Sequence, residues 1–112
     1  MDSIRQQKIN ALLKRELATI FQMESRNLFL GRFITVTQVR ITPDMGLAKV
    51  YLSIMTSKDK EADLKMIREQ GWMVRKKLAM VVGKQLRKMP ELAFYIDDSL
   101  DYYEQIDSLL KT

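Results

Sequence analysis

The sequence contains no cysteine and no histidine among its 112 residues. Their absence excludes disulfide bonds, zinc fingers, thiol nucleophiles, Ser-His-Asp triads and an imidazole general base. Enzymes that use Lys, Tyr or paired carboxylates pass this test, and so does any binding module. However, no candidate general acid and base share a convincing face. We therefore expect a protein that is not an enzyme, with no catalytic residue, no metal and no cofactor.

Long apolar segments are also missing from the sequence. No apolar run approaches the roughly 20 residues that span a bilayer, and the first ten residues lack the apolar stretch of a secretory signal. We expect a cytoplasmic protein without a membrane partner. The hydrophobic content of 46% and charged content of 29% are typical of a globular domain, and the length suits one domain over residues 1–112.

Charge is unevenly distributed along the chain, whose net charge is +5. Residues 65–89 carry eight basic residues and one acidic residue, whereas residues 91–112 carry six acidic residues and one basic residue. Such an asymmetry points to a polyanionic partner for one part of the molecule. The alternative is a pair of solvated helices of opposite charge that only keep the protein in solution.

The N-terminal part of the sequence predicts a long amphipathic helix. Apolar residues recur at helical spacing, so we expect a helix over residues 3 to about 24. Ser3 and Gln6 have the spacing of a capping box. Glu16 lies within the apolar stripe, where pairing with a nearby Arg is a simpler interpretation than a functional carboxylate.

A β-hairpin is predicted next. Residues 33–41 are rich in β-branched residues and predict a strand. Their apolar positions change phase, which indicates either a bulge or a strand covered on both faces. Residues 42–46 have the composition of a turn, and residues 47–55 predict the second strand.

The second half of the chain predicts two helices in succession, a strand and a last helix. The first helix has an apolar stripe formed by Leu64, Ile67, Gly71, Val74, Leu78 and Val81. Gly83 is expected to interrupt it, because glycine disfavours helix interiors, and a short helix over residues 84–88 should follow. Residues 92–96 predict a third strand, and Asp98 or Ser99 a cap for the last helix. This order predicts an α+β two-layer sandwich with helices on one face of a small sheet.

A tryptophan surrounded by cations forms a second face on the long predicted helix. Trp72 lies within about 100° of Lys65, Arg68, Arg75 and Lys76 on a helical wheel. The cations would attract phosphates, and an exposed Trp72 would stack on an unpaired base or a sugar. The alternative is that Trp72 lies against the core edge and the charges are solvated. The positive surface continues beyond Gly83 with Lys84, Arg87 and Lys88, although an ordinary kink also explains that glycine.

Two other groups look chemical but have simpler explanations. The acidic cluster of Asp97, Asp98 and Asp101 suggests a metal site, but a helix cap and an acidic first turn explain it better. Three methionines recur at heptad spacing on the long helix, which indicates loose packing or a partner surface. These methionines are Met66, Met73 and Met80.

Several short segments together resemble the ribosome-binding factor A (RbfA) family. They are the first helix with Arg5, Lys8 and Ile9, Pro43-Asp44, Ala48 to Ser53, Arg75, Leu86-Arg87, Pro90-Glu91-Leu92-Ala93-Phe94 and Asp97-Asp98-Ser99-Leu100. The resemblance covers nearly the whole chain and implies a type II KH-like fold. In that fold a kinked helix–helix junction replaces the Gly-x-x-Gly loop, so the expected order is α-β-β-α-kinked α-β plus a short C-terminal helix. On physical grounds we expect Gly83 at the kink.

The resemblance also implies a function. It predicts an assembly factor, monomeric when free, that binds the immature small (30S) ribosomal subunit and its 16S rRNA, assists maturation of the rRNA 5′ end and supports growth in the cold. Other assembly factors are further candidate partners. The residues expected to contact rRNA are Arg5, Lys8, Lys65, Arg68, Trp72, Arg75, Lys76, Lys84, Arg87 and Lys88.

The rRNA-binding assignment makes one expectation about a variant and has one alternative. If the basic face binds rRNA, reversing the charges of Arg75 and Lys76 should weaken binding without lowering the melting temperature. The alternative function is a protein–protein adaptor that docks another assembly factor or a ribosomal protein through its charged halves. Salt distinguishes the two, because phosphate contacts are salt-dependent.

Overall fold

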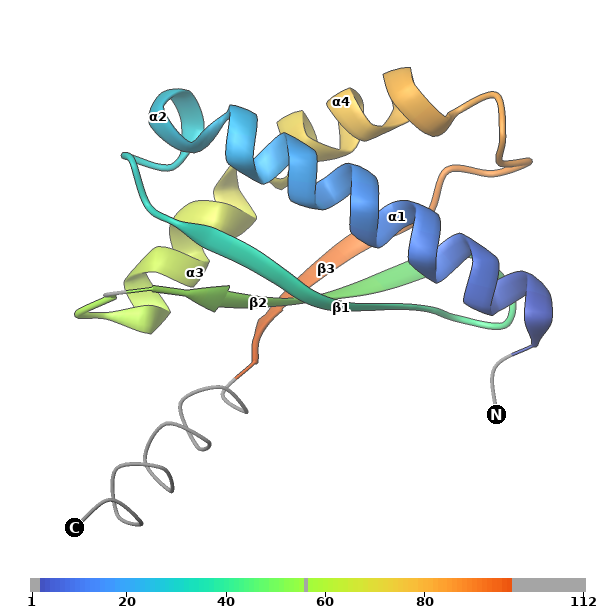
Figure 1. Ribbon diagram of the computed structural model, residues 1–112, viewed down its shortest axis with the longest axis horizontal. Coiled ribbons are helices and arrows are strands. Elements are labelled where there is room, and N and C mark those ends of the chain that lie inside the picture. Colours follow the sequence, from blue (N-terminus) through green and yellow to red (C-terminus); the bar gives the residue numbers. More distant parts are fainter. Residues whose placement is uncertain (1–2, 56, 98–112) are drawn as a thin grey trace, which may run out of the picture.

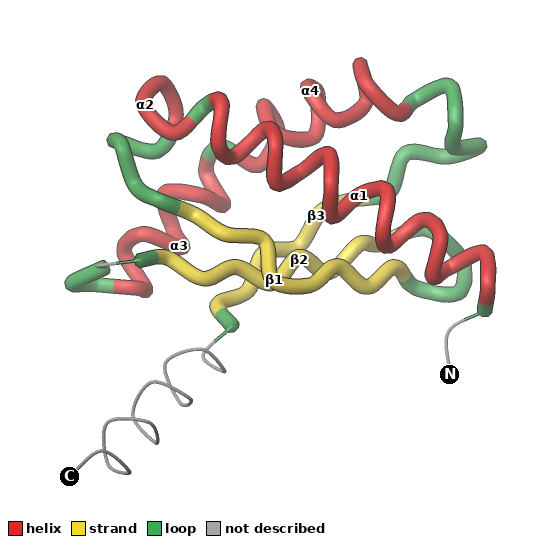
Figure 2. Tube along the Cα trace, viewed as in Figure 1, coloured by secondary structure: helices red, strands yellow, loops and turns green. Residues whose placement is uncertain are grey.

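The computed structural model describes residues 3–55 and 57–97, which form a three-stranded sheet with helices packed over one face (Figure 1). The sheet order is β1-β2-β3, with β1 antiparallel and β3 parallel to the central β2. Figure 2 shows α1 and α4 in one layer above the strands. The elements in chain order are α1 (Ile4–Met23), α2 (Ser25–Leu28), β1 (Ile34–Ile41), β2 (Leu47–Ile54), α3 (Lys60–Glu69), α4 (Gly71–Val82) and β3 (Glu91–Ile96).

The first helix begins and packs as its sequence predicts. The Ser3 hydroxyl accepts a hydrogen bond from the Gln6 N–H, and the Gln6 side chain accepts one from the Ser3 N–H, so the capping box is confirmed. Glu16 is partly exposed and lies 3.3 Å from the Arg15 guanidinium, in agreement with its interpretation as a paired carboxylate. The inner face of α1 buries Leu13, Leu17, Ile20 and Phe21.

The phase change in β1 is caused by a bulge. The pairing register with β2 shifts between Val36 and Gln38, which leaves Thr37 as the additional residue. Val36 and Val39 are therefore both buried although they are three residues apart. The bulge alternative is thus confirmed, because one added residue returns the apolar positions to the same face of the sheet.

The break in the helical region falls thirteen residues before its predicted position, at Gln70 instead of Gly83. The helix over residues 60–82 is interrupted at Gln70, where α3 ends and α4 begins at Gly71. Gly71 lies against the core, since a Cβ added there would be 3.2 Å from Cε2 of Phe94. Gly83 does end the helix, since it is the C-cap of α4, but the expectation that it forms a kink between two helices is wrong, because residues 84–88 form turns and bends. The break therefore lies next to the glycine that packs against Phe94, whereas Gly83 lies at the end of α4.

The region after α4 also differs from the prediction. Residues 84–88 form turns and bends instead of a short helix. The Gln85 N–H closes a turn onto Val82 O, while Leu86 packs against the core. Val82 is fully buried and Val81 is 53% exposed, so the apolar stripe ends one residue later than predicted. The predicted last helix, with Asp98 or Ser99 as its cap, lies outside the described residues.

The core lies between the sheet and the helices. The large side chains of the core include three phenylalanines from different parts of the described chain. The ring of Phe21 lies 5.1 Å from that of Phe29, centroid to centroid. It lies 6.0 Å from the ring of Phe94, and these two rings are perpendicular. Fully burying one such side chain contributes about 1.5–3 kcal/mol. The predicted α+β class is confirmed, and the element order fits the KH-like description. Within residues 3–55 and 57–97, no helix has the length and apolar character to cross a membrane.

Candidate nucleic-acid interface

The break between α3 and α4 borders a groove beside β3, which we call the junction groove. It has a volume of about 440 Å³ and is lined by Arg68, Gly71, Trp72, Arg75 and residues 91–95. Trp72 is 63% exposed. The alternative in which Trp72 lies against the core edge is therefore wrong, and the indole is accessible for stacking on a planar ligand.

Arg68 is anchored to the outer edge of β3. Its Nε and Nη2 donate hydrogen bonds to the Phe94 carbonyl oxygen at 3.2 and 2.7 Å. The guanidinium carbon also lies 5.9 Å from the centre of the Tyr95 ring, a cation–π distance. The Arg68 guanidinium therefore donates hydrogen bonds to a carbonyl oxygen of the sheet edge and covers an aromatic ring. Arg68 contributes to the stability of the fold as well as to the positive charge of the groove.

Arg75 anchors the other end of the same edge. Its Nε donates to Pro90 O and its Nη2 to Met89 O, both at 3.0 Å. The Glu91 carboxylate lies 3.7 Å from Nη2 and partly offsets the positive charge. Arg75 therefore connects α4 to the segment that leads into β3. These hydrogen bonds fix the orientation of its guanidinium group, including the N–H donors that they do not use.

Two predicted lysines lie outside the junction groove. Lys65 shares a shallow depression on α3 with Arg68 and with Glu61 and Glu69, each four residues away along the helix. Acids at this spacing offset part of its charge. Lys76 is exposed on α4 and does not line the groove. The basic face predicted for one continuous helix is thus divided between two helices.

A second groove, which we call the terminal groove, lies at the other end of the sheet. It measures about 650 Å³, and four predicted cations line it together with Asp44 of the β1–β2 turn. These cations are Arg5, Lys8, Arg87 and Lys88. The start of α1 and the loop after α4 meet at the same end of the molecule (Figure 1). Lys84 is exposed but does not line this groove.

Asp44 is held in the ionised form on the wall of the terminal groove. The Thr42 hydroxyl donates to its carboxylate at 2.6 Å, and the Gly46 N–H donates to it at 3.0 Å. These two hydrogen bonds, with a smaller contribution from the charge of Lys88, hold the pKa of Asp44 below its ordinary value of 3.8. One negative charge therefore remains among the four cations at neutral pH.

Sequence reasoning did not assign a role in the site to Tyr95 or Gly71. Tyr95 is 37% exposed, stacks on Tyr51 with centroids 5.5 Å apart and lies under Arg68. The predicted apolar stripe includes Gly71, although a glycine within a helical pattern is itself a signal of a close approach. In the sequence, Tyr95 could be recognised only as an aromatic residue in a predicted strand. Aromatic residues are common in strands, so this feature does not identify a site.

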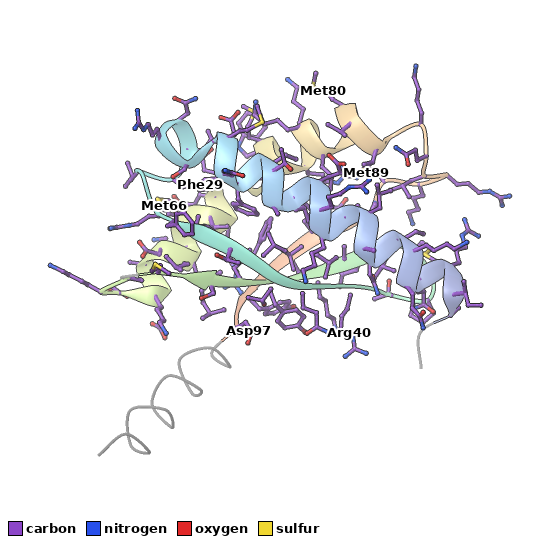
Figure 3. All side chains as sticks on the ribbon, viewed as in Figure 1. Phe29, Arg40, Met66, Met80, Met89 and Asp97 are labelled. Atoms are coloured by element: carbon purple, nitrogen blue, oxygen red, sulfur yellow. The ribbon has the colours of Figure 1, made fainter. Side chains whose placement is uncertain are left out.

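The structure also places part of the aspartate cluster and of the methionine stripe identified in the sequence. The Thr37 hydroxyl donates to Asp97 at 2.6 Å, while Asp98 and Asp101 lie outside the described residues. Residues 3–55 and 57–97 contain no cluster of acids suited to a metal ion. The methionine stripe is divided by the helix break: Met66 packs against the core, whereas Met80 is 79% exposed on the outer side of α4 (Figure 3).

Known proteins resemble this chain in sequence and fold. A profile of the family described as ribosome-binding factor A matches residues 5–110. Ribosome-binding factor A of Cytophaga hutchinsonii is 47% identical over 110 residues, covering 98% of this chain and 83% of that protein. The crystal structure of ribosome-binding factor A from Thermus thermophilus has a TM-score of 0.68 and 25% identity, covering 81% of this chain and 94% of the other.

A further match is a homology model of Thermus thermophilus ribosome-binding factor A that was fitted into a cryo-EM map of a 30S–RbfA complex. Its TM-score is 0.62 at 28% identity, and the alignment covers 80% of this chain and 91% of the other. The kinked junction implied by the resemblance is present between α3 and α4, at Gln70–Gly71 instead of Gly83. With the family profile matched over residues 5–110, this chain belongs to the ribosome-binding factor A family.

Proposed function

We propose that this chain is a cytoplasmic, non-enzymatic assembly factor that binds the immature small ribosomal subunit through its 16S rRNA. The match to the ribosome-binding factor A family over residues 5–110 carries the proposal. It is supported by the similar fold of the Thermus thermophilus protein in a 30S complex. The two cationic grooves supply a chemistry suited to the phosphates of RNA.

The two grooves would contribute differently to rRNA binding. In the junction groove, Arg68 and Arg75 are oriented by carbonyl groups of the β3 edge, next to the exposed Trp72. An unpaired base stacked on this indole is worth about 1–3 kcal/mol. In the terminal groove, Arg5, Lys8, Arg87 and Lys88 would contact phosphates. Phosphate contacts position a protein, so the shape of the folded rRNA supplies most of the specificity.

Co-sedimentation with purified immature small subunits tests the proposal. The apparent affinity should fall as salt is raised from about 50 to 200 mM, linearly in logarithmic coordinates, because phosphate binding releases counterions. Replacing Lys8 and Lys88 with Glu should weaken binding by about tenfold or more and flatten this dependence. Crosslinks from both grooves should map to 16S rRNA.

A matched variant controls for net charge. Lys14 and Lys58 are exposed and lie in neither groove. Replacing both with Glu changes the net charge by the same amount, so affinity close to that of the wild type is expected. Equal losses in the two double variants would contradict binding by the terminal groove. Binding that ignored salt and required another protein would favour the adaptor function instead.

We further propose that binding assists maturation of the 16S rRNA 5′ end and growth in the cold. The proposal is tested in a bacterium whose own member of the family has been deleted. Expression of this chain should restore growth at low temperature and reduce the amount of 16S precursor with an unprocessed 5′ end. Restored subunit binding without restored processing would overturn this part of the proposal and leave ribosome binding intact.

A further inference from the structure

The outer edge of β1 is closed at one end by side chains of α1. Gln6 Nε2 donates a hydrogen bond to Ile41 O at 3.2 Å, and the Ile41 N–H donates to Asn10 Oδ1 at 2.7 Å. Both main-chain groups of Ile41 are therefore satisfied by the first two turns of α1. An edge strand is a template for pairing with another chain, and this cover removes that opportunity at the Ile41 end.

The opposite end of β1 lacks such a cover among the described residues. The Met55 N–H donates to Phe33 O at 3.1 Å, which sets the phase of the antiparallel ladder. Phe33 and Thr35 therefore face β2, and the main-chain N–H and C=O groups of Ile34 and Val36 point away from it. A groove of about 690 Å³ follows this edge between β1 and the second half of α1. We call it the edge groove.

The lining of the edge groove combines apolar and cationic side chains. Met23 is 72% exposed and Phe33 is 66% exposed, so two large apolar side chains of the same groove are open to a partner. Arg26 and Arg32 also line it, and no Asp or Glu is among its lining residues. Arg32 has a partner in Asp63 at 3.3 Å, and Arg26 is exposed.

We infer that the edge groove binds an extended, acidic segment of a partner protein, which adds to β1 as a fourth strand. The main-chain groups of Ile34 and Val36 have the spacing of a strand and are complementary to another extended backbone. Alternate apolar side chains of the segment would pack over Ala18, Met23 and Phe33, and a carboxylate would pair with Arg26. The bulge at Thr37 ends the regular edge, so the paired stretch is about four residues long.

This inference is independent of the proposed rRNA binding. The residues of the edge groove belong to neither the junction groove nor the terminal groove. A nucleic acid would be attracted by the arginines, but it has no extended peptide backbone to pair with Ile34 and Val36. The combination of an open strand edge with exposed apolar side chains therefore selects a polypeptide.

Peptide selection on the full chain tests the inference. A phage library of random peptides of about nine residues, long enough to span the paired stretch with flanking residues on both sides, provides the probe. The selected peptides should have apolar residues at alternate positions together with Asp or Glu. A synthetic peptide of the enriched sequence should slow amide exchange at Ile34 and Val36 by about tenfold or more, as measured by NMR.

Two variants of α1 make the test specific. Ala18→Phe should fill the edge groove and weaken the peptide by about tenfold or more, since a side chain would occupy the bound segment's place. Ala11→Phe is the matched control, because Ala11 is exposed on the same helix outside the groove. Its affinity should equal that of the wild type. Both variants should unfold at the wild-type temperature.

Three results would overturn the inference. The first is an enriched set of peptides without alternation or acidic residues. The second is equal peptide affinity of Ala18→Phe and the wild type. The third is a dimer, detected by sedimentation, that Ala18→Phe dissociates, because the occupant would then be a second copy of this chain.

Discussion

The junction groove and the terminal groove both carry cations but hold them in different ways. In the junction groove, Arg68 and Arg75 donate hydrogen bonds to carbonyl oxygens along and next to the edge of β3. In the terminal groove, Lys8 of α1 and Arg87 of the loop after α4 are both exposed side chains. Charge in the first groove is therefore coupled to the stability of the fold, whereas charge in the second can change with little effect on stability.

The largest expected effect comes from breaking the junction itself. In Gly71→Leu the new side chain would be forced against Phe94, because even a Cβ lies 3.2 Å from the ring. We expect a loss of about 2–3 kcal/mol in the free energy of unfolding, measured in urea. Gly71→Ala should lose less. If the Leu variant were as stable as the wild type, the contact with Phe94 would not limit the size of the side chain at position 71.

Removing an anchored arginine should affect stability and binding together. Arg75→Ala leaves the carbonyl oxygens of Met89 and Pro90 without their donor, and we expect a loss of about 1–2 kcal/mol in urea unfolding. Charge reversal at Arg75 should therefore lower the melting temperature, in contrast to the expectation from the sequence. Arg87→Ala is the control and should stay within about 0.5 kcal/mol of the wild type. If Arg75→Ala were as stable as the wild type, cations in the junction groove would contribute no more to the stability of the fold than cations in the terminal groove.

Trp72 separates binding from stability within the junction groove. Because the indole is 63% exposed, Trp72→Ala should change the free energy of unfolding by less than about 0.5 kcal/mol. Its affinity for a single-stranded oligonucleotide of 16S rRNA sequence should fall about fivefold or more through lost stacking. Trp72→Phe should retain most of the affinity. Tryptophan fluorescence that does not respond to the oligonucleotide would argue against stacking.

The smallest effect concerns the pH dependence of the turn beside the terminal groove. The pKa of Asp44 is below its ordinary value, so ionised Asp44 favours the folded state above about pH 3.8. This contribution is lost as the pH falls through the folded-state pKa. An NMR titration should show the low midpoint, and Thr42→Val should raise it by removing the hydroxyl donor. An unchanged midpoint in Thr42→Val would show that the hydroxyl does not lower the pKa.

Much of the fold was predictable because it follows local rules. The capping box of Ser3 and Gln6 acts within one turn, and the bulge at Thr37 is visible as a change in the phase of apolar residues. The helix break was not predictable in this way. Two glycines lay in or beside the helical pattern: the break between α3 and α4 lies next to Gly71, which packs against Phe94, and α4 ends at Gly83.

The candidate site was predictable in composition more than in arrangement. The predicted cations and Trp72 were chosen from one face of the long predicted helix, from residues 84–88 beyond it and, for Arg5 and Lys8, from the first helix. The structure divides them, with Arg68, Trp72 and Arg75 in one groove and Arg87 and Lys88 in another. Their role in rRNA binding stays a prediction. The wheel could not show that Arg68 and Arg75 bond to β3, because that strand is distant in the sequence.

The sequence by itself determined the α+β class, the opposite charges of residues 65–89 and 91–112 and the absence of His and Cys chemistry, because composition and periodicity are local properties. Only the tertiary structure decided which residues meet. It placed Arg5 and Arg87 in the lining of one groove, opened the β1 edge beside Ala18 and placed the helix break beside Phe94. These contacts join segments that are far apart along the chain, and packing selects them through the shape of the whole core.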